Sequence, residues 1–367
     1  MDRRTALLAC AHIGLLCVAG PVASQPPPHI VFFNPGEPVE RGTGPYWRMV
    51  AQYMTAAAKQ LGMQLEILYA ERNHLLMLRQ AEEVARRAKP PDYVVIVNEK
   101  MAALQMLKTL EHSPAKIFIM HNDLTTEQRK EIGNERERIR NWIGTATTDA
   151  ARGGYLLMEY LYQRIGNREP RIIGITGDPN TPVSKERAQG VDEYVAHAKR
   201  GRTYPLMFGD WSYADGEQKT FVLLSRYPDT NIIWSSNDSM ALGALRAVKK
   251  RNAQVLVGGM GGWGDALVSI AENGLTATAA GDYMIGAWTV ILLHDYHHGQ
   301  DFAAHGGLNQ KLDYLYIVNR DNVARYDDVF FRNSGALDFS IYSQVRHPHA
   351  RAYDFRLAHL INKGKVS

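Results

Sequence analysis

The segment Ser-Ser-Asn-Asp-Ser, residues 235–239, carries short polar side chains that could hold a small polar ligand. It follows an apolar run at 231–235, which we expect to be a buried strand, and it precedes apolar residues that return at helical spacing from Met240. Asp238 or Ser239 could cap that helix, because a short oxygen-bearing side chain accepts bonds from the first free N–H groups. Open α/β sheets bind ligands at the carboxyl ends of their strands, so this segment is a candidate binding edge.

A second candidate is the glycine-rich run Gly-Met-Gly-Gly-Trp-Gly, residues 259–264, which spells GxGxxG between a predicted strand and a predicted helix. Asp282 follows the next predicted strand. This pattern is typical of a dinucleotide site, where glycines let the backbone approach a pyrophosphate at a helix N-terminus. A nicotinamide-dependent oxidoreductase is therefore one alternative, although the unit comes late in the chain.

Three histidines form the third candidate, because His294, His297 and His298 lie at positions i, i+3 and i+4 of one predicted helix. His294 and His298 could bind zinc together, but no third ligand of suitable spacing is evident. A histidine cluster at a helix end is the favoured interpretation. The sequence has no nucleophile elbow, no paired carboxylates with a placed base and no Walker motif, so we expect neither enzymatic activity nor a cofactor or metal.

Predicted strands and helices alternate along the chain, which is the arrangement that must position these candidates. Repeated βαβ units indicate a parallel, doubly wound sheet, and there are too many units for one sheet, so we predict two similar lobes. The predicted strands are 29–33, 64–69, 93–97, 116–120, 142–144, 171–176, 203–208, 231–235, 255–258, 276–279 and 313–318.

Residues 1–24 have the features of a signal peptide. Arg3 and Arg4 precede an apolar run at 6–19, and the small residues 22–24 follow. The two cysteines of the chain, Cys10 and Cys17, both lie in this segment, so the mature protein would contain no disulfide and no thiol. We therefore expect an exported protein.

Composition limits the remaining classes of function. The chain has 367 residues, of which 45% are hydrophobic and 22% are charged, as is usual for a globular protein of two domains. Its net charge is only +4 and it has no arginine-rich tract, which argues against a nucleic-acid partner.

Residues 236–245, Ser-Asn-Asp-Ser-Met-Ala-Leu-Gly-Ala-Leu, resemble the corresponding segment of type I periplasmic binding proteins of the ribose and galactose group, which share their fold with LacI-type repressors. The resemblance implies two Rossmann-like lobes joined by a three-segment hinge, with crossings near 148–149, near 281–282 and after the strand 313–318. We assign 25–148 with 282–312 to the N-terminal lobe and 149–281 with 313–331 to the C-terminal lobe. Residues 332–367 lie outside the resemblance. They could form a docking helix or a disordered extension.

The resemblance also implies a ligand site between the lobes. Tyr46 and Trp47 match rings that stack on the ligand, and Trp211 matches the opposite ring; aromatic faces suit the apolar C–H face of a sugar. Arg187 and Asn237 match residues that bond ligand hydroxyls, and a guanidinium offers five donors for such bonds. The alternatives are a Tyr-Trp pair that anchors a helix in the core and a solvated helix charge at Arg187.

The sequence departs from the sugar-binding pattern at several positions. His121 and Asn122 replace an Asp-Arg pair, Met260 replaces an Asp and Gly44 replaces an Asn. We still count His121, Asn122, Met260 and Asp282 as ligand-binding candidates. The lost polar groups predict a ligand less rich in hydroxyls than a simple aldose. An imidazole contact predicts that affinity changes between about pH 5.5 and 7.5.

Together these features predict a monomeric periplasmic solute-binding protein that captures a small sugar-like or signalling ligand between two lobes. Bonds from both lobes would favour the closed form, which an inner-membrane ABC permease would then recognise. The alternative is a ligand-sensing receptor for a histidine kinase or chemoreceptor, and an oxidoreductase is less favoured.

Overall fold

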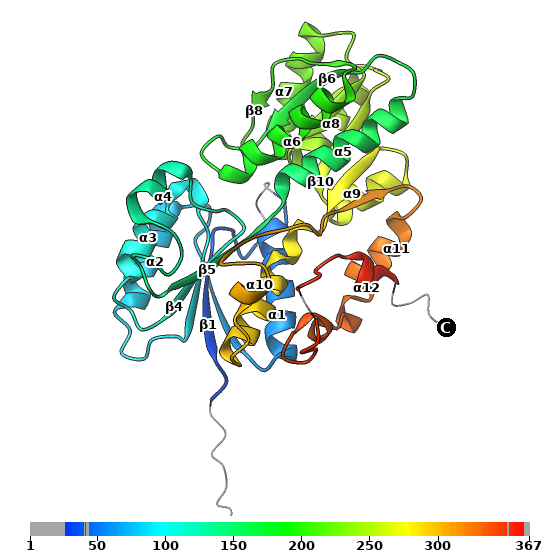
Figure 1. Cartoon of the computed structure of the whole chain (residues 1–367). Coiled ribbons are helices and arrows are strands. Elements are labelled where there is room, and N and C mark those ends of the chain that lie inside the picture. Colours follow the sequence, from blue (N-terminus) through cyan, green and yellow to red (C-terminus); the bar gives the residue numbers. More distant parts are fainter. Residues whose placement is uncertain (1–25, 40, 42–43, 351, 363–367) are drawn as a thin grey trace, which may run out of the picture.

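The computed structural model describes residues 26–39, 41, 44–350 and 352–362. Two largely parallel sheets, each covered by helices, form two lobes (Figure 1). The predicted α/β class and the two-lobe arrangement are confirmed. The predicted signal peptide lies outside the described residues.

The N-terminal lobe contains six parallel strands in the order β12-β5-β4-β3-β1-β2. Its strands are β1 (His29–Asn34), β2 (Gln64–Tyr69), β3 (Tyr93–Ile96), β4 (Lys116–Met120), β5 (Trp142–Thr148) and β12 (Asn309–Leu312). Its α-helices are α1 (Tyr46–Gln60), α2 (His74–Ala85), α3 (Ala103–Leu110), α4 (Thr126–Ile132) and α10 (Ile285–His297), and short 3-10 helices occupy Glu99–Met101, Asp282–Met284 and Phe302–His305.

The C-terminal lobe has the strand order β13-β11-β10-β9-β6-β7, with β8 also paired to β6. All its strands are parallel except β13, which runs antiparallel to β11. The strands are β6 (Arg171–Thr176), β7 (Arg202–Thr203), β8 (Met207–Phe208), β9 (Ile232–Ser235), β10 (Leu256–Gly261), β11 (Ala277–Ala280) and β13 (Tyr316–Asn319). The helices are α5 (Ala150–Ile165), α6 (Pro182–Ala198), α7 (Tyr213–Arg226), α8 (Asp238–Lys250), α9 (Gly264–Ala271) and α11 (Val323–Asp327).

Strand β1 shows how the sequence builds a sheet that is buried on both faces. Ile30 and Phe32 point into the core shared with α1 and α10, whereas Val31 and Phe33 point into the core under α2 and α3. Successive side chains of a strand face opposite sides, so a continuous apolar run is needed when helices cover both faces.

The chain passes between the two sheets after β5, after β11 and between β12 and β13. The last crossing corrects the prediction of one strand at 313–318 followed by a crossing. The segment from Asp313 to Leu315 runs between the sheets, and its Tyr314 is buried against Thr148 and Asp282 of the other two crossings. Nothing in the sequence of this region indicated two short strands, β12 and β13, separated by a linker.

Other elements also differ from the sequence prediction, and β12 (Asn309–Leu312) was not predicted. The predicted strand at 203–208 is two separate pieces, β7 and β8. Helix α4 was missed, although Thr125 and Gln128 form a capping box at its start, which is a recognisable sequence signal.

The extension after β13 is packed against the body of the protein. Helix α11 lies against α9 and β13, and the chain then crosses to the N-terminal lobe, where Tyr53 of α1 donates a hydrogen bond to the Phe330 carbonyl. Trp288 of α10 stacks on Phe355 with ring centroids 4.9 Å apart. The short helix α12 (Ala358–Asn362) ends the described chain. The described part of the extension therefore docks on the protein.

The α10 carboxylate of Asp295 ties this extension down. Asp295 is fully buried and accepts hydrogen bonds from the Ser343 hydroxyl, the Gln344 N–H and the Tyr353 hydroxyl.

No helix in the described part of the chain has the length and apolarity required to cross a lipid bilayer.

Candidate ligand-binding site

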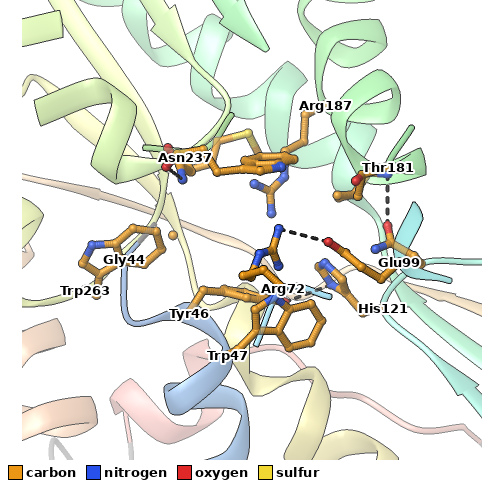
Figure 2. A pocket seen from close by; sticks show the side chains of 15 residues that line it. Gly44, Tyr46, Trp47, Arg72, Glu99, His121, Thr181, Arg187, Asn237 and Trp263 are labelled. Carbon is orange, nitrogen blue, oxygen red and sulfur yellow. Dashed lines mark hydrogen bonds and ion pairs between the residues drawn. The ribbon is translucent and has the colours of Figure 1, made fainter. Parts of the chain in front are cut away.

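A pocket lies between the lobes, at the carboxyl ends of strands from both sheets, where open α/β sheets keep their ligands (Figure 2). It contains about 550 Å³ of empty space, part of which is open to solvent. The lining residues are Gly44, Tyr46, Trp47, Arg72, Glu99, His121, Asn122, Thr181, Val183, Arg187, Trp211, Asn237, Met260, Gly261 and Trp263. The structure therefore brings together every predicted site residue except Asp282.

The N-terminal lobe contributes an aromatic wall. Tyr46 and Trp47 begin α1 with their ring centroids 4.9 Å apart, and the Tyr46 hydroxyl lies 2.9 Å from His121 Nδ1. A Cβ on Gly36 would lie 2.2 Å from Trp47 Cβ, so the loop before α1 needs glycine there. Trp47 lines the pocket and also belongs to the hydrophobic core.

His121 is neutral at physiological pH in this environment. Burial lowers its pKa to about 4, and the positive charges of Arg187 and Arg72 add to this effect, while Asp282 opposes it. The predicted change of affinity between about pH 5.5 and 7.5 assumed an imidazole with an unperturbed pKa, whereas burial lowers the pKa of His121 in this structure. The imidazole contributes one donor and one acceptor and no charge.

Arg187 and Trp211 form the opposite wall. The Arg187 guanidinium donates to the Ser236 carbonyl at 2.5 Å and pairs with the Asp282 carboxylate, and it lies 5.9 Å from the Trp211 ring centroid. Arg187 is 5% exposed, so the alternative of a solvated helix charge is wrong. Its Nε has no hydrogen-bond partner among the described residues. That N–H is an available donor beside the pocket.

Asn237, and not Asp238 or Ser239, caps α8. Its Oδ1 accepts from the Met240 N–H at 2.8 Å, and its Nδ2 donates to the Trp211 carbonyl at 2.8 Å. These two bonds fix the amide between α8 and the loop that carries Trp211. An amide has two donors and two acceptor sites, so half its capacity remains for a ligand.

Asp238 instead holds the glycine-rich loop. Its carboxylate accepts from the Gly262 N–H at 2.6 Å and from the Thr278 hydroxyl at 2.7 Å, and burial raises its pKa to about 6. Gly261 and Gly262 have φ values of 147° and 80°, and a Cβ on Gly262 would lie 2.2 Å from the Ala280 Cβ. Of the motif glycines, Gly259 and Gly261 are required by local packing, since a Cβ would lie 2.5 Å from Asp238 Oδ1 and 2.1 Å from Trp263 Cζ3, whereas a Cβ on Gly264 would meet nothing within 4 Å. One N–H of the loop, that of Gly262, points at a carboxylate of the protein.

Asp282 does not line the pocket but lies behind Arg187. It accepts a hydrogen bond from Thr148 and its carbonyl accepts from the Tyr314 hydroxyl, at 3.0 Å. Thr148, Asp282 and Tyr314 each belong to one of the three crossing segments. The network therefore links a pocket side chain, Arg187, through Asp282 to all three connections between the lobes.

Five further lining residues were not predicted from the sequence, namely Arg72, Glu99, Thr181, Val183 and Trp263. Arg72 follows β2 and Glu99 follows β3. The rule that ligands bind at the carboxyl ends of strands, which pointed to Ser236–Ser239, would therefore have found both residues. Arg72 Nη2 lies 3.0 Å from Glu99 Oε1. No sequence signal marked the backbone, which is left-handed at three lining residues, Arg72, His121 and Trp211, with φ of 60°, 70° and 74°. Such conformations are costly outside glycine and gather at functional sites.

The three histidines of α10 have partners within the protein. His294 Nδ1 lies 2.8 Å from Asp295 Oδ1, and His298 Nδ1 donates to the His294 carbonyl at 2.8 Å. His297 Nδ1 lies 3.1 Å from the Tyr93 hydroxyl. Across the described ranges, no three or more His, Cys, Asp or Glu side chains gather as a metal site.

Comparison with known proteins agrees with this geometry. Residues 39–301 match the family model described as "Periplasmic binding protein domain". The chain belongs to the periplasmic binding protein domain family. A periplasmic sugar-binding protein from Pseudomonas fluorescens is similar over 91% of this chain and 99% of that one, with a TM-score of 0.80 and 30% identity.

Curated relatives of the family are more distant. The ribose import binding protein of Haemophilus influenzae is 29% identical over 140 residues, 38% of this chain and 47% of the relative. The D-allose-binding periplasmic protein of Escherichia coli is 21% identical over 243 residues, 65% of this chain and 76% of the relative. The chain thus spans about half the length of the ribose-binding relative that it matches.

Proposed function

We propose that this protein is a periplasmic solute-binding protein that captures one small carbohydrate between its lobes and presents the closed form to an ABC permease. The observation that carries the proposal is the pocket itself. Tyr46, Trp47 and His121 line it from one lobe, and Arg187 and Trp211 line it from the other. Aromatic faces with a few placed polar groups are the usual composition of a site for a sugar.

Contacts between the lobes support a closing mechanism. Asn122 of one lobe bonds the Val183 N–H of the other, and Lys311 Nζ lies 3.6 Å from Glu186 Oε2 across the same gap. A ligand bonded to both walls adds interactions that only the closed form can make, so it shifts the population towards closure by that difference in affinity.

The relatives support the choice of ligand and partner. One is named for ribose import and another for D-allose, so pentoses and hexoses are the first ligands to test. We propose a monomer in the periplasm as the working form. We propose the residues of the two walls, together with Asn122, Asn237 and Met260, as the ligand contacts.

The test begins with protein purified from its native compartment without refolding. Mass spectrometry of the copurified small molecules, followed by calorimetry with D-ribose, D-allose and NAD, should show a bound carbohydrate and no NAD binding. Binding of NAD with no sugar would support the oxidoreductase instead. Deletion of the gene should abolish uptake of the bound sugar. Normal uptake with a lost kinase or chemotactic response would identify a sensory receptor.

A further inference from the structure

Arg72 and Glu99 form an ion pair inside the pocket. Arg72 follows β2 and Glu99 follows β3, and Figure 2 shows the Arg72 side chain directed into the pocket and joined to Glu99. The Glu99 side chain is 2% exposed, and the Arg72 side chain is 23% exposed. A carboxylate that is buried so fully normally needs several donors to offset its lost hydration.

Glu99 has fewer partners than its burial demands. Its Oε1 lies 3.0 Å from Arg72 Nη2, but the geometry is not that of a hydrogen bond, and within the described ranges this buried atom has no other partner. Glu135 in the same lobe provides a contrast. Its side chain is 3% exposed, and it accepts two hydrogen bonds from Arg129, at 2.9 and 3.2 Å. Glu99 therefore retains acceptor capacity beside the pocket.

The backbone around this pair is also strained. Glu71 and Arg72 have φ values of 50° and 60°, and Lys100 and Met101 have φ values of 46° and 65°. Arg72 itself and three residues beside the pair are thus non-glycine residues in left-handed conformation, which is costly unless the side chains are needed where they lie. The Glu71 and Arg72 N–H groups donate to the Gly36 and Pro35 carbonyls, which fixes the loop.

The two charges of the pair select a particular kind of ligand group. A guanidinium only donates hydrogen bonds and a carboxylate only accepts them. A hydroxyl does both, so it can accept from Arg72 and donate to Glu99. The pocket also has no free charge for an ion, because Arg187 is paired with Asp282, Arg72 is paired with Glu99, and His121 is neutral. A charged ligand would add a buried charge without a partner.

We propose that Arg72 and Glu99 are the specificity-determining residues of the N-terminal lobe, and that they bind a vicinal diol of an uncharged sugar. This inference rests on the proposed function and deepens it. It also replaces the expectation of a ligand poor in hydroxyls. His121 and Asn122 stand where the sugar binders have a charged Asp-Arg pair, and Arg72 and Glu99, which follow β2 and β3, supply a carboxylate and a guanidinium instead. A site built to bond hydroxyls discriminates strongly against ligands without them.

The test is calorimetry of the whole protein and of three variants, Glu99→Gln, Arg72→Gln and the matched control Glu135→Gln. The probes are D-ribose, D-allose, their 2-deoxy and 3-deoxy analogues, and D-ribonate. The parent should bind at least one sugar and should bind one of its deoxy analogues about tenfold or more weakly. Glu99→Gln and Arg72→Gln should each weaken sugar binding about tenfold and reduce the preference over that deoxy analogue. Glu135→Gln should change affinity less than about twofold.

Three outcomes would overturn the inference. If the parent binds a sugar and the two pocket variants bind it equally well, the pair has no role in recognition while the proposed function stands. If D-ribonate binds the parent more tightly than D-ribose, the ligand class is anionic. If none of the sugars binds the parent, the carbohydrate function and the inference fall together. Circular dichroism of each variant establishes that it is folded.

Discussion

Asn122 Oδ1 accepts a hydrogen bond from the Val183 N–H, at 3.1 Å, across the gap between the lobes. Asn122 follows β4 of one sheet, and Val183 lies in the first turn of α6 in the other lobe, where backbone N–H groups have no partner within the helix. Both residues line the pocket. The first turn of a helix in one lobe is thus capped by a side chain from the other, so closure satisfies a donor that the open form leaves to water.

Replacing Asn122 by Ala should weaken ligand binding by about 1 kcal/mol, or roughly fivefold, because the closed form loses one hydrogen bond. Small-angle scattering should show a larger radius of gyration for the ligand-free variant than for the parent, and a decrease when sugar saturates either protein. Asn309→Ala is the control, since Asn309 bonds Asp123 within the same lobe. Identical scattering of parent and variant, with and without sugar, would refute closure through this bond.

Replacing Arg187 by Ala should destabilise the protein as well as weaken binding. The change leaves the carboxylate of Asp282, which is 2% exposed, without its cation, and the loss of one partner of a buried pair costs about 3–5 kcal/mol. The double variant Arg187→Leu with Asp282→Asn removes both charges and should recover much of the stability but not the binding. Urea denaturation measures the first effect and calorimetry the second. Equal stability of Arg187→Ala and the parent would contradict the pairing.

The stability contribution of Asp238 should increase as the pH falls. Burial raises the pKa of Asp238 to about 6, above its ordinary value, so the folded protein binds more protons than the unfolded chain between roughly pH 4 and 6. From pH 7 to pH 4, the free energy of unfolding of the parent relative to Asp238→Asn should rise by about 2 kcal/mol. Denaturation curves at several pH values test this. A constant difference would show that Asp238 is not buried as described.

His121 should have the opposite effect. Its pKa is lowered to about 4 by burial, so the unfolded chain binds more protons as the pH falls from 6.5 to 4, and stability is lost over that range. The His121→Gln variant should escape this loss, which is about 3 kcal/mol by pH 4. Denaturation curves of the parent and of His121→Gln at several pH values measure this loss of stability. A parent and variant with parallel pH profiles would mean that His121 remains exposed in solution.

Phe355 should matter for stability and not for binding. Its ring is buried against Trp288, and removing a buried Phe side chain costs about 3–5 kcal/mol. Phe355→Ala should therefore lower the urea midpoint strongly while sugar affinity at low temperature stays unchanged. Phe208→Ala is the matched control, because Phe208 is 56% exposed and its loss should cost less than about 0.5 kcal/mol.

The fold was predictable where the sequence repeats a strong local pattern. Apolar runs such as that of β1 alternate with amphipathic helices, and this alternation alone predicts parallel sheets in two lobes. The pattern failed at Asp313–Leu315, because a strand and a linker in extended conformation bury similar side chains. It also failed at β7 and β8, where the strand is interrupted around Tyr204.

The site was predictable in position more than in detail. Eight of the nine predicted residues line the pocket, since family resemblance and the strand-end rule both point there. The roles were harder to predict because they depend on tertiary partners. Nothing in the sequence shows that Asp238 supports a loop, that burial keeps His121 neutral or that Arg72, which follows β2, reaches Glu99 after β3, on the other side of β1. A charged residue after a strand can be solvated or buried, and only its surroundings decide.

The C-terminal extension gives the two lobes a fourth covalent connection, through Asp328–Arg332, in addition to the three crossings around Asp282. Arg325 then bonds the Ile361 carbonyl, so the end of the described chain returns to the segment where the extension began. Two lobes joined by three adjacent crossing segments can rotate towards each other and can also twist about each other. A further attachment removes some of that rotational freedom, so the lobes should open and close by rotation about a single hinge axis.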